Sequence, residues 1–131
     1  MLYDPLRRKD VADTPEERVR QWFIGVLRDV VGVPPHMMMS EVSLKNGAKP
    51  YRADIVVWSR SGEPLMIVEC KRPGVELSED VARQALVYNN ILNVNYIAVT
   101  NGMHTRMYRR DGNGFLPMAA LLKWEEMTCQ R

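Results

Sequence analysis

Two apolar runs separated by a helix-length segment constrain the fold of this chain more than any other feature. Residues 64–71 (PLMIVECK) and 95–100 (NYIAVT) are rich in β-forming side chains. Between them, Arg72-Pro73-Gly74 stops the first run, and Ser78 can cap a helix that extends through Asn93. Two strands joined through a helix are expected to lie parallel, with a right-handed crossover. The pattern therefore predicts an α/β fold in which helices flank a mixed central sheet.

The segments on either side complete the order helix, three strands, helix and two strands. Thr14 and Pro15 suit the cap and the first position of a helix that Gly32 ends. Its apolar stripe, at helical spacing, consists of Val19, Phe23, Val26, Leu27 and Val30. The other expected elements are strands at 41–45, 51–58 and 105–110, a flexible loop at 111–114 and a short terminal helix at 118–124. We expect residues 1–13 to be a loosely ordered N-terminal arm and residues 14–131 to be a single domain.

Composition excludes several classes of protein. A chain of 131 residues has the size of one domain, and 46% apolar with 26% charged residues is typical of a globular fold. Two cysteines do not make a disulfide scaffold, no apolar run approaches the ~18 residues of a membrane span, and no G-x-x-x-x-G-K-[ST] phosphate loop occurs. A net charge of +2 argues neither for nor against a polyanionic partner. The first residues lack the layout of a signal peptide, so a cytoplasmic location is expected.

Charged residues inside two of the expected strands point to a site. Asp54 interrupts an apolar strand, and Glu69 and Lys71 end the next, although buried carboxylates are costly unless paired or bound to a cation. The turn at 59–63 folds these strands together, so Asp54 lies beside Glu69 if the register allows, which the sequence does not fix. Two converging carboxylates suit Mg²⁺, and an adjacent ammonium group can orient or help to deprotonate an attacking water. The alternative is a salt bridge between Lys71 and either carboxylate.

Polar residues on the two helices extend this candidate site. Gln84 lies with Tyr88 on the apolar face of the second helix, where it needs a partner from a nearby site, a nucleic-acid backbone or a main-chain carbonyl. On the first helix, a helical wheel directs Glu16 toward the apolar stripe and Glu17 away from it. Glu16 can therefore reach a metal site, or it simply complements the helix dipole. Arg20 flanks the stripe and can contact phosphate or balance the carboxylates.

Together, these residues resemble the PD-(D/E)XK nuclease superfamily. The matching segments are 52–57 (RADIVV), 67–71 (IVECK) and Gln84-x-x-x-Tyr88. More narrowly, residues 15–21 (PEERVRQ) and 99–102 (VTNG) resemble the N-terminal nuclease domain of type I restriction enzyme R subunits. The resemblance covers roughly residues 14–117. It implies a restriction-endonuclease-like αβββαβ core, with residues 14–131 forming a single nuclease-like domain.

The resemblance also implies a function and a set of site residues. The implied activity is hydrolysis of phosphodiester bonds in DNA by an endonuclease that depends on Mg²⁺ (or Mn²⁺). By motif position, Asp54 and Glu69 would bind the metal, with Glu16 as the helix carboxylate and Glu17 as its fallback. Lys71 would position or activate water, and Gln84 would act beside it. The residues expected to contact DNA are Gln84, Tyr88, Arg20 and Arg52.

Other functions stay open at this stage. A type I R subunit carries a large ATP-driven translocase that this chain lacks, so a partner subunit that supplies specificity or translocation is an expectation. The same fold can also serve as a non-catalytic module that binds DNA or a protein. A third alternative is an assembly role, such as homodimer formation through the methionine-rich segment at 37–39.

Overall fold

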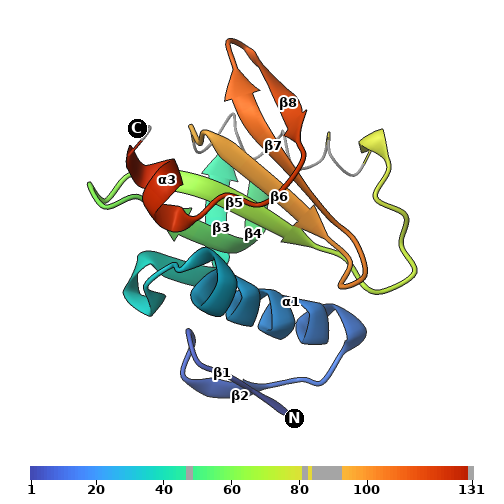
Figure 1. The fold of residues 1–131 in the computed structure, drawn as a ribbon. Helices are drawn as coiled ribbons and strands as arrows, with labels where there is room; N and C mark the ends of the chain where they lie inside the picture. The colour runs from blue at the N-terminus through green and yellow to red at the C-terminus, as the bar shows by residue number, and fades with distance from the viewer. Residues whose placement is uncertain (47–48, 81–82, 84–92, 130–131) are drawn as a thin grey trace.

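A computed structural model describes residues 1–46, 49–80, 83 and 93–129. In these residues, helix α1 lies between a small hairpin and a six-stranded sheet (Figure 1). The strands of the sheet lie in the order β3-β4-β5-β6-β7-β8, and the hairpin consists of β1 and β2. The bounds are β1 Leu2–Asp4, β2 Lys9–Val11, α1 Pro15–Val26, β3 Met38–Asn46, β4 Lys49–Trp58, β5 Pro64–Cys70, β6 Tyr96–Thr100, β7 Thr105–Asp111, β8 Gly114–Met118 and α3 Trp124–Cys129.

The pairing of β5 with β6 confirms the parallel unit that the two apolar runs predict. Ile67 lies opposite Ile97 and Val68 opposite Ala98, whereas every other neighbouring pair of strands in the six-stranded sheet is antiparallel. The sheet is therefore mixed, as expected. The predicted helix from Ser78 through Asn93 falls largely on 81–82 and 84–92, which lie outside the described residues.

Helix α1 begins where its cap predicts. The Thr14 side chain accepts a hydrogen bond from the Glu17 N–H at 3.1 Å, and Pro15 is the first helical residue. A π-helical turn at Leu27–Val31 follows, and Gly32 ends it with φ 83°. The π turn adds a residue per turn and changes which side chains face the sheet. Val31 is consequently buried and Val30 is 55% exposed, so the expected burial of Val30 is wrong.

Apolar side chains pack on both faces of the sheet. On one face, α1 contributes Phe23 and Ile24 to a cluster with Ile55, Val68 and other strand residues. A second cluster on the other face contains Val56, Ile67, Ile97 and Val99. This alternation along β4 and β5 is the period of two that strands impose, and it leaves the ends of the strands to carry polar side chains.

The N-terminal segment is a hairpin, and it corrects the expectation of a loosely ordered arm. β1 and β2 pair antiparallel, and Figure 1 shows the hairpin against α1 on the side away from the large sheet. Asp4 is fully buried and accepts hydrogen bonds from the Leu6 and Arg7 N–H groups, the Arg7 guanidinium and the Ser40 hydroxyl. The signal missed in the sequence is an Asp followed by turn residues, because the carboxylate caps its own turn.

The C-terminal part also differs from the sequence expectation. Residues 114–118 form β8, an edge strand paired with β7, and residues 111–114 form the tight turn between them rather than a flexible loop. The helix expected at 118–124 is wrong, because Met118 pairs with Met107 and the helix α3 begins only at Trp124. Trp124 anchors α3 by donating a hydrogen bond to the Trp58 carbonyl at 2.9 Å. Among the helices described, none is long and apolar enough to cross a membrane.

The buried Asp4 predicts a pH-dependent contribution to stability. Burial opposes the charge, but hydrogen bonds from Arg7, Leu6 and Ser40 outweigh it and lower the pKa of the Asp4 carboxyl group. Because the pKa is depressed in the folded state, this stabilisation is present above the ordinary carboxyl pKa of about 4 and is lost as the pH falls through the folded-state value. Asp4→Asn should lower the free energy of unfolding by about 2 kcal/mol at pH 7.

Urea unfolding of wild type and variant at pH 7 and pH 3 measures this contribution. The difference between the two proteins should shrink at pH 3. Asp10→Asn is the matched control, since Asp10 lies exposed on the same hairpin. An equal difference at both pH values would contradict the assigned role of the Asp4 charge.

Candidate functional site

Asp54 lies where β4 and β5 stop pairing. The last pair at this end is Ile55 with Val68, so Asp54 and Glu69 are each one residue beyond it. Asp54 Oδ2 accepts a hydrogen bond from the Cys70 N–H at 2.7 Å, so a side chain takes up a main-chain donor where the strands part. The register that the sequence left open therefore places the two acidic residues level with each other.

The strand on the other side of Asp54 is also irregular. β3 pairs Ser40 with Ile55 and Val42 with Ala53, and Glu41 between them has φ 51°. A left-handed conformation at a residue other than glycine costs on the order of 1–3 kcal/mol and persists only where contacts enforce it. Here the contacts are ionic, because the Glu41 carboxylate lies within 3.0 Å of Arg20 and 3.2 Å of Arg52.

Arg20 joins helix α1 to Asp54. Its Nη2 donates to Asp54 Oδ1 at 2.8 Å, and its Nη1 lies 2.8 Å from Glu17 and 3.0 Å from Glu41. The side chain is only 9% exposed. Burial opposes the charge, but the hydrogen bond and attraction of Asp54, with Glu17 and Glu41 behind it, raise the pKa of Arg20. Among the described residues, the buried Nε of Arg20 has no hydrogen-bond partner.

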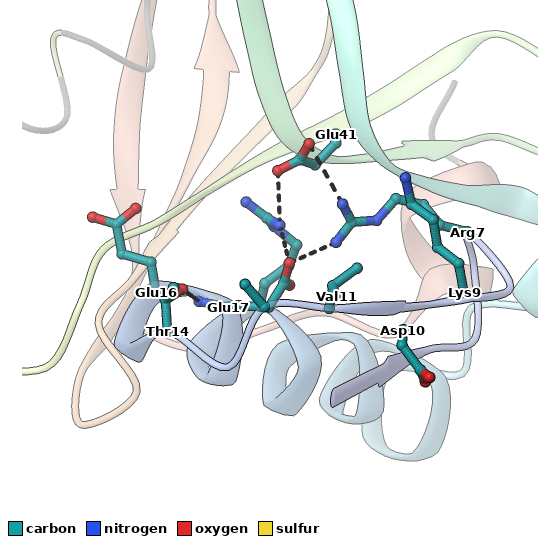
Figure 2. A pocket seen from close by; sticks show the side chains of 10 residues that line it. Arg7, Lys9, Asp10, Val11, Thr14, Glu16, Glu17 and Glu41 are labelled. Carbon is teal, nitrogen blue, oxygen red and sulfur yellow. Dashed lines mark hydrogen bonds and ion pairs between the residues drawn. The ribbon is translucent and has the colours of Figure 1, made fainter. Parts of the chain in front are cut away.

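Arg7 extends these ion pairs to the N-terminal hairpin. Its Nη2 lies 2.6 Å from Glu17 Oε1 and its Nη1 3.5 Å from Glu41, while its Nε bonds to Asp4. Figure 2 shows Arg7 and Glu41 converging with Glu17. These three residues line an open pocket of ≈ 440 Å³. We call the series Asp4, Arg7, Glu17, Arg20 and Asp54 the ion-pair chain. It links the hairpin, α1 and β4 through alternating charges.

Glu69 and Lys71 form the salt bridge that was the alternative from the sequence. Lys71 Nζ lies 3.3 Å from Glu69 Oε1, and Glu69 is 8% exposed. The neighbours of Glu69 along β5, Val68 and Cys70, belong to the cluster on the α1 face, so strand parity directs Glu69 to the other face. Arg20 of α1 contacts Asp54, whereas Lys71 contacts Glu69.

The turn after β6 braces the segment that follows Lys71. The Lys71 N–H donates to the Thr100 carbonyl at 2.8 Å, and Asn101 Nδ2 donates to the Val75 carbonyl at 2.8 Å. Asn101 Oδ1 accepts hydrogen bonds from the main-chain N–H groups of Met103 and His104. Gly102, between Asn101 and Met103, has φ 87°. A Cβ on Gly102 would lie 3.2 Å from a methyl group of Val19, a tight contact, and the left-handed φ at this position favours glycine. These contacts explain the VTNG segment.

The helical-wheel prediction for Glu16 and Glu17 is wrong. Glu17 is 7% exposed and bonds to Arg7 and Arg20, whereas Glu16 is exposed, and Figure 2 shows it turned away from that network. The wheel counted Val26 as part of the buried stripe, but the side chains that α1 and its π turn bury are Val19, Arg20, Phe23, Ile24, Leu27 and Val31. Their centre is rotated toward Glu17.

The remaining predicted residues are placed only in part. Arg52 is exposed and bonds to Glu41 at 3.2 Å, while Gln84 and Tyr88 lie outside the described residues. In the part of the chain that the structure describes, no three acidic, histidine or cysteine side chains gather closely enough to hold a metal between them, so Asp54, Glu69 and Glu16 do not form a three-residue cluster. Sequence reasoning missed Arg7 and Glu41. Neither carries a local signal, since both reach the site only through tertiary contacts.

The order of elements and the comparisons with known proteins identify a nuclease-like α/β domain with a restriction-endonuclease-like fold. The chain belongs to the family described as type I restriction enzyme R protein N terminus (HSDR_N), whose model matches residues 15–121. A search of curated proteins finds no match.

Two solved structures share the fold. The chain is similar to the fragment structure of a putative HsdR subunit of a type I restriction enzyme from Vibrio vulnificus YJ016, with a TM-score of 0.68 and 16% identity over 88% of this chain. It spans 25% of that fragment. It is also similar to a putative nuclease belonging to DUF820 from Anabaena variabilis ATCC 29413, with a TM-score of 0.50 and 13% identity over 93% of this chain and 84% of that one.

The rate at which the Cys70 thiol is alkylated reports on the burial and the charge of the site. Burial raises the pKa of its thiol well above the ordinary value, and the negative charge of Asp54 adds to the shift. Cys129 is exposed. Iodoacetamide at pH 8 should therefore alkylate Cys129 first and Cys70 more slowly by on the order of 100-fold or more, because the thiolate is the reactive species.

Mass spectrometry of timed samples measures the two rates. Cys129→Ser should be labelled only at the slow rate of Cys70 while the protein is folded, and rapidly once urea unfolds it. Asp54→Asn should accelerate labelling of Cys70, because the Asn side chain keeps the size but loses the charge that both Arg20 and the Cys70 N–H contact. Equal rates at the two cysteines in the folded wild type would contradict this arrangement.

Proposed function

We propose that this chain is a Mg²⁺-dependent DNA nuclease domain that hydrolyses phosphodiester bonds. The observation that carries the proposal is the placement of Asp54 and Glu69 one residue beyond the last β4–β5 pair, with Lys71 beside Glu69. Membership of the type I restriction enzyme R N-terminal family supports the same reading. The substrate and any partner subunit belong to the proposal, since the chain spans a quarter of the HsdR fragment that it resembles.

The donor set fits Mg²⁺ in the way that phosphoryl-transfer sites use it. Mg²⁺ takes one or two carboxylates and fills its other positions with water and phosphate oxygens, so no cage of three side chains is needed. Asp54 and Glu69 lie level on neighbouring strands. In this proposal each would give the metal an oxygen at the strand ends, Asp54 from the α1 side, where Arg20 contacts it, and Glu69 from the other face. When bound, the metal would polarise the phosphoryl oxygen and lower the pKa of a bound water.

Local charge favours a cation at this place. Around the ion-pair chain, the carboxylates of Asp4, Glu17, Glu41 and Asp54 outnumber the guanidinium groups of Arg7, Arg20 and Arg52 by four to three. Glu69 and Lys71 balance each other. The excess of negative charge beside a phosphate site would be repulsive to DNA without a metal.

The chain's own residues take distinct roles in this proposal. Lys71, 25% exposed at its side chain, carries an ammonium group that would orient the attacking water and neutralise charge on the phosphate. Glu69 holds that ammonium group in place at 3.3 Å. Arg20, Arg52, Gln84 and Tyr88 stay proposed contacts to DNA. Glu17 replaces Glu16 as the buried helix carboxylate, and it acts through Arg20.

Cleavage of DNA tests the proposal directly. The wild-type chain should relax and linearise supercoiled plasmid in Mg²⁺ or Mn²⁺ and should be inactive in EDTA. Lys71→Ala and Asp54→Asn should each lower the cleavage rate by about 100-fold or more, the usual effect of losing a group that handles the water or holds the metal. Gel electrophoresis of timed samples gives the rates.

Arg18→Ala is the matched control for these variants. Arg18 lies on α1 beside the site residues, but its side chain is 69% exposed and pairs with Asp13. Its removal should leave the cleavage rate within about twofold of wild type. If Lys71→Ala cut as fast as this control, the proposed mechanism would be wrong.

A second candidate function is binding of DNA without cleavage. The observation that favours it is the engagement of both Asp54 oxygens, Oδ1 by Arg20 and Oδ2 by the Cys70 N–H. A site locked in this state would bind no metal. Fluorescence anisotropy with labelled duplex DNA separates the two functions: salt-dependent binding that is indifferent to Mg²⁺, with no cleavage, would support the binding module over the nuclease.

A further inference from the structure

The role of Arg20 goes beyond a contact to DNA. Resting on the proposed function, we propose that Arg20 and a divalent cation are alternative partners of Asp54. The guanidinium group neutralises the carboxylate in the metal-free protein and gives up Oδ1 when the metal binds. Arg20 is thereby a built-in competitor that sets how tightly the site takes its metal.

The two terminal nitrogens of the Arg20 guanidinium group contact different carboxylates. Nη2 contacts Asp54 Oδ1 at 2.8 Å, whereas Nη1 contacts Glu17 and Glu41 at 2.8 and 3.0 Å. Loss of the Asp54 contact therefore removes one ion pair and leaves two in place. Arg20 can release Asp54 without leaving its own position on α1.

Burial explains why Asp54 needs such a partner. Its side chain is 17% exposed and that of Arg20 is 9% exposed, so neither charge is well hydrated. A charge in this setting is retained only when paired or bound to a cation. Before a metal arrives, Arg20 is the cation that satisfies this need.

The hydrogen bonding of Arg20 is incomplete. A guanidinium group has five N–H donors, and its buried Nε has no partner among the described residues. The contacts to Asp54, Glu17 and Glu41 therefore do not saturate it. The unbonded Nε–H leaves the metal-free arrangement less than fully stabilised, because a buried donor without a partner costs free energy.

Competition has a measurable consequence. Replacing Arg20 with a neutral residue removes the competitor and a positive charge a few ångströms from the metal position. Both effects strengthen metal binding, by roughly tenfold or more. If Arg20 instead served only to hold Asp54 in place, its loss would weaken metal binding.

Calorimetric titration of Mn²⁺ into the full chain, without DNA, tests these opposite expectations. The proteins are wild type, Arg20→Gln, Asp54→Asn and the control Arg18→Gln. Arg20→Gln should bind Mn²⁺ about tenfold tighter than wild type. Asp54→Asn should lose the binding event, and Arg18→Gln should match wild type within about twofold.

The outcomes separate this inference from the proposed function. If wild type binds Mn²⁺ through Asp54 and Arg20→Gln binds equally or more weakly, the competition is overturned and the metal-dependent function stands. If neither wild type nor Arg20→Gln binds Mn²⁺, both fail. Binding by Arg20→Gln alone would support the competition in its strongest form.

A measurement on the wild-type chain keeps the inference testable if Arg20→Gln does not fold. The Nε–H group of Arg20 is buried, so its NMR signal should be observable, and Arg20→Lys identifies it by its loss. Saturation with Mg²⁺, followed in parallel by heat, should shift this signal as Asp54 is released. An unchanged signal at saturation would overturn the proposal.

Discussion

A carboxylate at the place where two strands separate must have a compensating charge, and much of this structure is arranged around that need. Asp54 sits at the end of the β4–β5 ladder and receives Arg20 from α1 on one oxygen and the Cys70 N–H on the other. Arg20 is in turn held by Glu17, and Glu17 by Arg7 of the hairpin. The need to neutralise Asp54 on β4 therefore connects three elements that are distant in sequence: β4, α1 and the hairpin.

The hairpin lies outside the residues that define the family and nevertheless takes part in the site. The family model matches residues 15–121, whereas Asp4 and Arg7 precede them. Arg7 reaches the same two carboxylates, Glu17 and Glu41, that hold Arg20. The contacts around Arg20, the partner of Asp54, therefore extend to a segment outside the matched region.

Sequence reasoning succeeded where periodicity or capping decides the structure. The parallel β5–β6 pair and the start of α1 follow from apolar runs and from Thr14 with Pro15. It failed where tertiary contacts decide. The π turn shifted burial from Val30 to Val31, and the error in the wheel exchanged Glu16 for Glu17. The sequence identifies Asp54 and Glu69 as candidate residues but not their relative positions, because these depend on the register of strand pairing. Arg7 and Glu41 carry no local signal at all.

The ion-pair chain is a poor source of stability, and this bears on why it exists. Burying charged pairs costs desolvation that their attraction often fails to recover, and apolar side chains of similar volume frequently do as well. Stability here comes from the two apolar clusters on the faces of the sheet. Further cost comes from the strained backbone of Glu41 and from the buried Nε of Arg20, which has no partner among the residues that the structure describes. Under the proposed function the network has a purpose that folding does not give it, because a site that takes a divalent cation must neutralise its excess carboxylate charge until the cation binds.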